Sequence, residues 1–296
     1  MKILLLSCST GEGHNHCALA VKEALDARGH ETSFLDMLHM FGDPGPLSFD
    51  KILNRISTKA PDVFGMMYHA GAMYSATGVT SPVYMANIRH ARQLNAFIRD
   101  NGYDAVVCSH LFPMETLTFL RRWERCEVKC CGILSDYTCI PFLAETDLDA
   151  YFLPHSEVRE LCIQAGMPAE KLIVSGMPVA ARFLAPMDKA AARAALGLPT
   201  DKKIYLIMTG GISSSEAAML GVPLVHTMAI PGVETENAAF FARHGLSFFA
   251  RSVDEAARFA DRLIYDPVCA ERMLAAQAAW LPRNGAEQIA AAITAQ

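Results

Sequence analysis

The stretch MKILLLSCSTGEGHNH, residues 1–16, joins a strand-like apolar run to a glycine-containing turn. Residues 1–7 are almost continuously apolar, which is typical of a strand buried on both faces of a parallel sheet. The turn contains Gly11 and Gly13, and residues 18–28 have the apolar spacing of a helix that ends at Gly29. The sequence therefore predicts a strand, a tight turn and a helix, the opening unit of a doubly wound α/β fold.

The same rhythm of buried strand and helix continues through the first 180 residues. Polar residues follow two of these strands directly, His110 after residues 103–109 and Asp136 after residues 128–135. Open α/β sheets bind ligands at the carboxyl ends of their strands, so His14, His110 and Asp136 are expected to converge on one crevice. The further strands are expected at residues 31–38, 149–153 and 171–175.

His14 lies at the mouth of the first turn. A neutral imidazole there can take a proton from an attacking hydroxyl near pH 7. The alternative is a histidine that caps the helix or bonds to a neighbouring carbonyl. The turn lacks the third glycine of a dinucleotide-binding fingerprint, so a nicotinamide or flavin cofactor is disfavoured.

Composition narrows the functional class. A chain of 296 residues with 52% hydrophobic and 19% charged residues suits two globular domains, and a net charge of −5 gives no general attraction to nucleic acid. The nine cysteines are scattered without a C-x-x-C pair, which favours reduced, buried thiols in a cytoplasmic protein over a zinc site. No secretory signal is visible, and the apolar runs are too short for a conventional spanning helix.

Residues 50–97 are predicted to be helical, with breaks at Gly71, Gly78 and Pro82, and are unusually rich in methionine and aromatic residues. A basic-rimmed apolar patch can lie on an anionic bilayer, and two core helices with a kinked connection are the alternative. The apolar residues are Phe64, Met66, Met67, Tyr68, Met73, Tyr74, Val79, Val83, Tyr84 and Met85, and the basic ones are Lys51, Arg55, Lys59, Arg89, His90 and Arg92.

A change of composition around residues 182–199 predicts a linker, with domains at 1–182 and 183–296. The second half has only three strand candidates, at residues 204–208, 223–227 and 246–249, fewer than a complete Rossmann-like domain needs. Within it, residues 210–216 (GGISSSE) indicate a tight loop and a helix N-terminus, which suits a phosphate. Glu216 would then be available to sugar hydroxyls. The alternative is an ordinary N-cap followed by an acidic residue.

Six short motifs occur in an order that resembles monogalactosyldiacylglycerol synthases and processive diacylglycerol glucosyltransferases. This resemblance runs from residue 1 to about residue 290 and implies a GT-B-like fold of two Rossmann-like doubly wound domains, the second one truncated. It also implies a metal-independent, inverting transfer of a hexosyl group from a UDP-sugar to a diacylglycerol-type lipid. The motifs are residues 10–15, 109–110, 135–137, 176–179, 211–217 and 231–237.

The resemblance also implies roles for individual residues. It makes His14 the general base, and the acceptor side would be formed by His110, Asp136 and Tyr137. The donor would be bound by Gly210, Gly211, Ser213, Ser214, Ser215, Glu216, Glu234 and Asn237. No metal and no cofactor besides the co-substrate UDP-sugar are implied. Roughly residues 60–90 would contact an anionic membrane surface, which would make the protein cytoplasmic and peripheral on the inner face of the cell membrane.

One departure from the family pattern affects the donor domain. Thr209-Gly210 runs straight into Gly211-Ile212, as if two glycine-containing loops had been fused and the chain between them removed. The sequence therefore supports a second hypothesis, a catalytically impaired or non-catalytic acceptor-binding protein at a membrane. A sugar-nucleotide epimerase is disfavoured, because it has no use for a lipid-binding segment.

Overall fold

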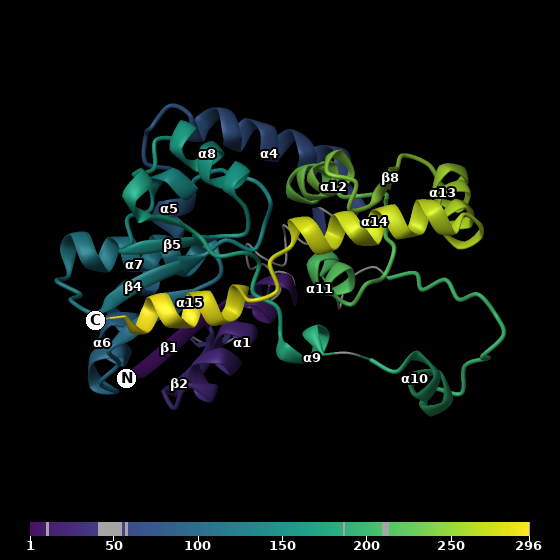
Figure 1. Cartoon of the computed structure of the whole chain (residues 1–296). Helices are drawn as coiled ribbons and strands as arrows, with labels where there is room; N and C mark the ends of the chain where they lie inside the picture. Colours follow the sequence, from purple (N-terminus) through teal and green to yellow (C-terminus); the bar gives the residue numbers. More distant parts are fainter. Residues whose placement is uncertain (10–11, 41–54, 57–58, 186, 209–212, 296) are drawn as a thin grey trace. The chain divides into compact units, whose positions relative to one another are not determined.

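The computed structural model describes residues 1–9, 12–40, 55–56, 59–185, 187–208 and 213–295 (Figure 1). Its main feature is a parallel sheet of six strands in the order β2-β1-β3-β4-β5-β6. All six predicted strands of the first half are present, each shortened by a residue or more. They are β1 (Lys2–Ser7), β2 (Glu31–Asp36), β3 (Ala105–Cys108), β4 (Lys129–Ile133), β5 (Ala150–Leu153) and β6 (Leu172–Val174).

The central strands are apolar because both of their faces are covered by helices. Residues Ile3 to Leu6 of β1 have no exposed surface, and Ile3 pairs with Ala105 of β3 in a parallel register. The neighbouring thiols of Cys108, Cys130 and Cys131 are buried in the same core. This packing aligns the carboxyl ends of the strands, so the residues that follow them share one edge.

Helices and short 3₁₀ turns connect these strands. The segment that was predicted to be helical with breaks contains α4, which continues through Gly71, and α5, which begins at Pro82. The helices are α1 (Glu12–Ala27), α2 (Met37–Met40), α4 (Pro61–Ser75), α5 (Pro82–Asn87), α6 (Ala91–Asp100), α7 (Leu111–Trp123), α8 (Ser156–Gln164) and α15 (Gly285–Thr294), with 3₁₀ turns η1 (Ile88–His90), η2 (Leu143–Glu145) and η3 (Ala169–Lys171).

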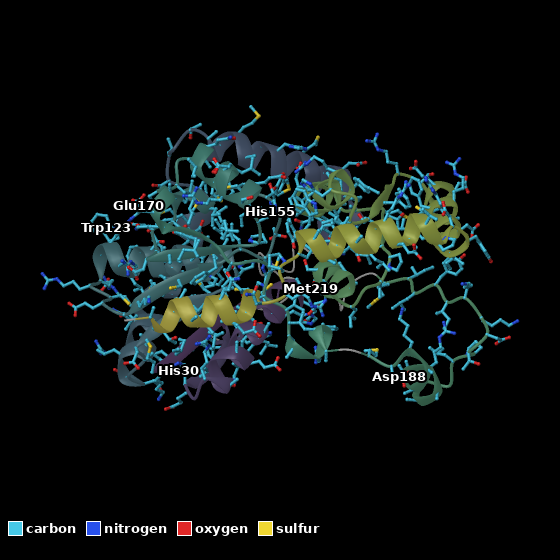
Figure 2. The ribbon with its side chains drawn as sticks, viewed as in Figure 1. His30, Trp123, His155, Glu170, Asp188 and Met219 are labelled. Atoms are coloured by element: carbon cyan, nitrogen blue, oxygen red, sulfur yellow. The ribbon has the colours of Figure 1, made fainter. Side chains whose placement is uncertain are left out.

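The cap of α8 is a histidine. His155, labelled in Figure 2, precedes the helix, and its Nδ1 accepts a hydrogen bond from the backbone N–H of Glu157 at 3.2 Å. Ser156 is the first helical residue. A neutral imidazole nitrogen serves the same purpose as a serine hydroxyl here, because either one accepts from an otherwise unpaired N–H.

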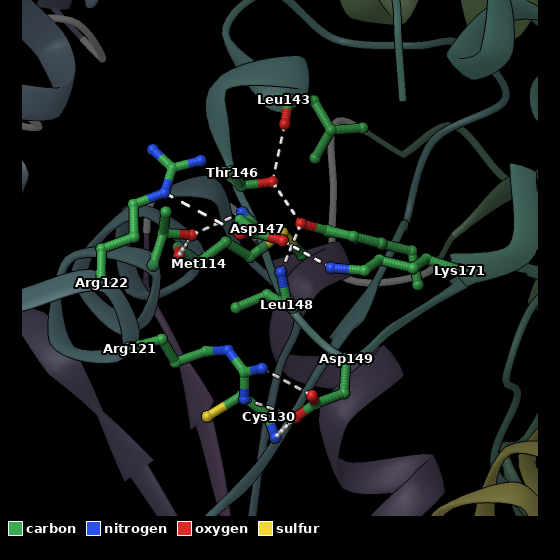
Figure 3. A network of polar contacts seen from close by, with 12 residues as sticks. Met114, Arg121, Arg122, Cys130, Leu143, Thr146, Asp147, Leu148, Asp149 and Lys171 are labelled. Atoms are coloured by element: carbon green, nitrogen blue, oxygen red, sulfur yellow. Dashed lines mark hydrogen bonds and ion pairs between the residues drawn. The ribbon is translucent and has the colours of Figure 1, made fainter. Parts of the chain in front are cut away.

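Ion pairs brace the amino-terminal edge of the sheet, opposite the predicted crevice (Figure 3). The guanidinium of Arg121 binds both carboxylate oxygens of Asp149, at 2.7 and 2.6 Å, and Asp149 also accepts from the backbone N–H of Cys130 at 2.7 Å. Nearby, Lys171 binds Asp147 at 2.5 Å. The bidentate pair holds the last turn of α7 to Asp149, which precedes β5, and the bond from Cys130 N–H ties the same carboxylate to β4.

The chain divides into two compact units, and the boundary after Ala180 lies close to the predicted one. The contact-based division differs from the predicted second domain, 183–296, in two segments that belong to the first unit, Ala229–Asn237 and Pro282–Gln296. Helix α15 lies against α1 in the first unit, and the Nζ of Lys129 donates to the carbonyl of Ile293 near its end at 2.9 Å. Helix α15, near the end of the sequence, is therefore part of the first unit.

The second unit contains one small parallel pair of strands, β7 (Val225–Thr227) and β8 (Phe248–Ala250). The third predicted strand, at residues 204–208, is wrong: it has no regular secondary structure, and Leu206 and Ile207 are 79% and 88% exposed. An apolar strand needs a sheet to cover it, and no strand in the described part of this unit pairs with it. The helices are α9 (Ala181–Leu184), α10 (Lys189–Ala195), α11 (Ser214–Met219), α12 (Val233–Arg243), α13 (Val253–Tyr265) and α14 (Pro267–Trp280).

Candidate functional site

His14 lies in the first turn of α1, immediately beyond the carboxyl end of β1. Its Nδ1 is 2.9 Å from the backbone oxygen of Ser109 and 2.8 Å from the hydroxyl oxygen of Ser135. A carbonyl oxygen can only accept a hydrogen bond, so the proton of the neutral ring must be on Nδ1. This tautomer leaves the lone pair of Nε2 as the basic position of the ring.

The hydroxyl of Ser135 connects His14 to a carboxylate. It donates to Oδ2 of Asp136 at 3.2 Å and accepts the shared proton of His14 Nδ1. These two residues follow β4 directly, as His14 follows β1 and Ser109 follows β3. Three neighbouring parallel strands thus bring His14, Ser135 and Asp136 together, as the sequence predicted for His14 and Asp136.

Asn237 of α12 completes this set from a position 101 residues further along the chain than Asp136. Its Nδ2 donates to Oδ1 of Asp136 at 2.8 Å, and its Oδ1 accepts from the backbone N–H of Tyr137 at 2.7 Å. The sequence assigned Asn237 to the donor side, and Asp136 and Tyr137 to the acceptor side. In the structure Asn237 bonds directly to both of these residues, and all three belong to the first unit.

His110 has a different function from the other polar residues at this edge. Its Nδ1 accepts from the backbone N–H of Phe112 at 3.1 Å and so caps α7, and its ring meets that of His14 edge to face, with ring centres 4.7 Å apart. Burial, together with nearby His14, lowers the pKa of His110 well below its ordinary value. His110 is therefore neutral at pH 7 and forms a wall beside His14.

A small pocket lies beside the His14 ring. Its polar side is formed by His14, Ser109, Ser135 and Asp136, and the rest is mainly apolar. Its cavity of about 10 Å³ has room for about one water molecule, so it suits a single hydroxyl beside the histidine and not a whole ligand. The other lining residues are Leu111, Met114, Ile133, Leu134, Thr138, Ile140 and Leu143.

The serine and glutamate motif of the second unit forms a capping box. The backbone N–H of Glu216 donates to the Ser213 hydroxyl at 3.1 Å, and the Glu216 carboxylate accepts from the Ser213 N–H at 2.6 Å. Glu216 is only 2% exposed. These contacts correspond to the N-cap alternative considered for this motif. The predicted donor residues Gly210 and Gly211 lie outside the described residues.

The next residue of the motif, Ser214, contacts a histidine that the sequence analysis did not select. The Ser214 hydroxyl is 2.6 Å from Nε2 of His226, and Nδ1 of His226 is 2.8 Å from the Ser247 hydroxyl. Burial lowers the pKa of His226 to about 4, so the ring is neutral at pH 7. A histidine inside the predicted apolar strand at residues 223–227 was the available signal. Ser215, which was also predicted to bind the donor, is 2% exposed.

The remaining predicted donor residue, Glu234, also makes a local contact. Its carboxylate accepts from the backbone N–H of Ile230 at 3.0 Å and so orders the turn that leads into α12. Glu115 of α7 was missed by sequence reasoning because it resembles an ordinary helical glutamate. It is fully buried, binds the side chain of Asn87, and burial raises its pKa to about 9, with nearby Glu145 adding to the effect.

Helix α4 has one packed side and one exposed side. A Cβ atom built on Gly65 would lie 2.7 Å from the Pro231 side chain, and the ring of Tyr68 packs on Gly232, so this side fits closely against the turn before α12. On the other side Met66 and Met73 are 68% and 75% exposed. On helix α5, Met85 is also exposed. Among the described residues, no helix is both long and apolar enough to span a membrane.

Within the described ranges, no group of three or more histidine, cysteine, aspartate or glutamate residues could hold a metal ion. Residues 14–179 match the family model of monogalactosyldiacylglycerol (MGDG) synthase. The chain belongs to the MGDG synthase family. This membership confirms the resemblance inferred from the six motifs.

Two Bacillus relatives of this MGDG synthase family member are both called processive diacylglycerol beta-glucosyltransferase. The protein of Bacillus cytotoxicus is 23% identical over 240 residues, which cover 78% of this chain and 60% of the relative. A Bacillus cereus protein is 22% identical over 342 positions, covering 90% of this chain and 86% of the relative. That alignment is longer than the 296-residue chain, so the Bacillus cereus protein has residues with no counterpart here.

Solved structures with the same fold include MurG of Acinetobacter baumannii, with a TM-score of 0.59 and 12% identity over 99% of this chain and 98% of MurG. The MnaA–UDP structure from S. aureus has a TM-score of 0.54 and 12% identity, over 97% of this chain and 94% of MnaA. These similarities establish the fold alone. It is GT-B-like, with an α/β architecture, as the sequence predicted.

Proposed function

We propose that this protein transfers a hexosyl group from a UDP-sugar to the hydroxyl of a diacylglycerol-type lipid, with inversion at the sugar. The observation that carries the proposal is the orientation of His14, whose Nδ1 is held by Ser109 and Ser135 and whose basic Nε2 is left for an acceptor hydroxyl. Family membership and the names of the Bacillus relatives support the reaction class.

The proposed reaction is a single displacement. Nε2 of His14 takes the proton of the lipid hydroxyl as that oxygen attacks the anomeric carbon of the sugar. A new carbon–oxygen bond forms on one face while the bond to the UDP oxygen breaks on the other, which inverts the configuration. UDP leaves with the bonding electron pair, and the proton remains on the imidazolium until it passes to solvent.

On the donor side, Glu216 and Glu234 are proposed to bind hydroxyls of the ribose and the sugar, and Ser213 to Ser215 to lie beside the diphosphate. The observation in support is that the capping box holds Ser213 and Glu216 in one compact turn. Hydrogen-bond donors of the protein would stabilise the leaving diphosphate in place of a metal.

The membrane contact is proposed to use the exposed apolar surface of α4 and α5. Val63, Met66, Met73 and Met85 on these helices are between 44% and 75% exposed, which is costly for a surface that meets only water. Exposed Arg89 follows α5 and would be attracted to anionic lipid headgroups. The protein would then be peripheral on the inner face of the cell membrane.

Release of UDP from UDP-glucose and from UDP-galactose, measured with vesicles that contain diacylglycerol, tests the proposal. The wild-type chain should release UDP only when the lipid acceptor is present. His14→Ala should lower the rate by about 100-fold to 10,000-fold, the range for loss of a general base. Full activity of His14→Ala would contradict the assigned base. EDTA should leave the rate unchanged, and loss of the rate in EDTA would contradict metal independence.

A second candidate function is a non-catalytic, membrane-associated protein that binds the acceptor lipid. Two observations favour it: the described part of the second unit has only two paired strands, and the Bacillus cereus relative has residues with no counterpart here. Calorimetric titration with UDP separates the two candidates. Micromolar binding supports the transferase, whereas no binding at millimolar UDP supports the second candidate.

A further inference from the structure

The strongest unassigned feature of the site is the hydroxyl of Ser135, which lies between His14 and Asp136. We infer that Ser135 is a positioning residue, which couples the carboxylate of Asp136, itself held by Asn237, to the imidazole of His14. The inference rests on the proposed function of His14 as the base. Ser135 thereby gains a positioning role. Asn237, which the sequence assigned to donor binding, instead holds Asp136.

The direction of every hydrogen bond in this chain of residues follows from simple chemistry. A backbone N–H can only donate, so the Asn237 atom that faces Tyr137 N, at 2.7 Å, must be the amide oxygen. The NH₂ group therefore faces Asp136 at 2.8 Å, where a carboxylate oxygen accepts it. Neither end of the Asn237 amide can be reversed without placing two donors or two acceptors together.

The same reasoning fixes the direction of the hydrogen bonds between Asp136, Ser135 and His14. The second oxygen of Asp136 accepts the Ser135 hydroxyl proton at 3.2 Å, which turns the lone pairs of the Ser135 oxygen toward His14 Nδ1 at 2.8 Å. The Nδ1–H is shared with the carbonyl oxygen of Ser109. Ser109 alone is sufficient to select the tautomer, so Ser135 adds ring orientation and a connection to a negative charge.

That connection matters when His14 takes the proton of the acceptor. The ring then becomes an imidazolium, and the Asp136 carboxylate, relayed through one hydroxyl, stabilises the positive charge. Asn237 contributes by holding Asp136 in the orientation that faces Ser135. The effect should appear in the rate of the chemical step and leave donor affinity unchanged.

The kinetic test compares Ser135→Ala with Ser135→Thr. The alanine variant should lower kcat by about 10-fold to 100-fold with the KM for the UDP-sugar changed less than about twofold. Threonine retains the hydroxyl, and the position is half-buried, so Ser135→Thr should recover at least a third of the wild-type kcat. Equal losses in both variants, or a loss confined to KM, would overturn the inference.

Ser175→Ala provides a matched control. Ser175 also follows a strand of the same sheet, but within the described residues its hydroxyl bonds to backbone oxygens alone, those of Gly176 at 3.0 Å and Leu153 at 3.4 Å. Its kcat should stay within about twofold of wild type. A loss as large as that of Ser135→Ala would mean that removal of any hydroxyl at this edge impairs the enzyme.

Asn237→Asp tests the hydrogen bond at the opposite end of this series from His14. The substitution keeps an oxygen for the Tyr137 N–H but replaces the donor that faces Asp136 with a second negative oxygen. It should lower kcat at least fivefold, and in the Ser135→Ala background it should lower kcat less than twofold further, because the connection is already broken. A changed preference between UDP-glucose and UDP-galactose with unchanged kcat would assign Asn237 to the donor sugar instead.

Nitrogen-15 NMR of the histidine side chains separates failure of this inference from failure of the proposed function. The neutral His14 ring should show a protonated Nδ1 and an unprotonated Nε2 in the wild-type chain. Its Nδ1 signal should move in both Ser135→Ala and Asn237→Asp and remain in place in Ser175→Ala. An unchanged His14 signal in the two variants would overturn the inference, whether or not the chain transfers sugar.

Discussion

The two units of this protein differ in how completely each one buries its apolar residues. In the first unit, six parallel strands form one sheet covered by helices, and Ile3 to Leu6 are fully buried. In the second, two three-residue strands form the only pairing within the described residues, and Leu206 and Ile207 are 79% and 88% exposed. The first unit therefore has a sheet with a buried apolar core. In the described part of the second unit, the apolar residues 204–208 are covered by no sheet.

This difference separates the two halves of the proposed reaction. The first unit holds a histidine with a fixed tautomer, a connected carboxylate and an apolar pocket. The contacts of the donor residues in the second unit are those of an ordinary capped helix. Acceptor activation is thus supported by geometry, whereas donor binding is supported by family membership and sequence motifs.

The largest expected effect is on the free energy of unfolding, and it is seen by replacing one apolar residue in each unit with alanine. Leu5→Ala removes a fully buried side chain of β1 and should lower the free energy of unfolding by about 2–5 kcal/mol. Ile207→Ala removes an 88% exposed one and should change it by less than about 0.5 kcal/mol. Urea denaturation followed by circular dichroism measures both. A loss of 2 kcal/mol or more in Ile207→Ala would show that residues 204–208 are buried in solution.

The sequence predicted the first unit well because its signals are local and repeated. β1, β3 and β4 are mostly apolar runs, and polar residues come after them at a shared edge, so His14 and Asp136 were found together. Ser135 was quoted in a motif but not selected, since a serine has no distinctive pattern without its neighbours. The contact between Asn237 and Asp136 joins positions 101 residues apart, which no spacing rule reveals.

The second unit was predicted less well for a physical reason. The run at residues 204–208 has the composition of a buried strand, but strand formation depends on partners that periodicity does not report. His226 was overlooked because residues 223–227 have the pattern of a short strand, in which a polar residue is not unusual. The predicted domain limits differ from the two compact units at Ala229–Asn237 and Pro282–Gln296, because the chain returns to the first unit through contacts that have no sequence signature.

A second expected effect, in the first unit, concerns alkaline pH. Glu115 has an ordinary pKa of 4.5 and a folded pKa of about 9, so the folded state keeps a proton that the unfolded state has released. Stability should therefore fall as pH rises between these values, by at most about 1.4 kcal/mol per pH unit. Glu115→Gln keeps the shape without the charge and should remove this slope. Urea midpoints from pH 5 to 9 measure it, and equal slopes in both proteins would contradict the assignment.

The opposite trend is expected in the second unit at acid pH. His226 has an ordinary pKa of 6.5 and a folded pKa of about 4, so the unfolded state binds a proton that the folded state lacks. Stability is thus lost as pH falls from 6.5 toward 4. Hydrogen exchange, corrected for its intrinsic pH dependence, should show α11 and β7 losing protection at pH 5 relative to pH 7. His226→Gln should weaken that change, and a change of the same size in the variant would contradict it.

The smallest expected effect concerns the capping box. Glu216→Ala removes one side of it and should destabilise the second unit by about 0.5–2 kcal/mol. Glu216→Gln can still accept from the Ser213 N–H and should cost less than half as much. Thermal unfolding compares the two. If UDP affinity falls in both variants although Glu216→Gln remains stable, the carboxylate also binds the donor. Unchanged affinity in Glu216→Gln would restrict Glu216 to the capping role.

The most direct test of the proposed function is detection of the glycolipid itself. Wild-type protein and His14→Ala are each incubated with a UDP-hexose and diacylglycerol vesicles, and the lipids are extracted and analysed by mass spectrometry. We expect a hexosyl-diacylglycerol of inverted configuration from the wild-type chain, and at least about 100-fold less from His14→Ala. No glycolipid from the folded wild-type chain with either UDP-glucose or UDP-galactose, or equal amounts from both proteins, would contradict it.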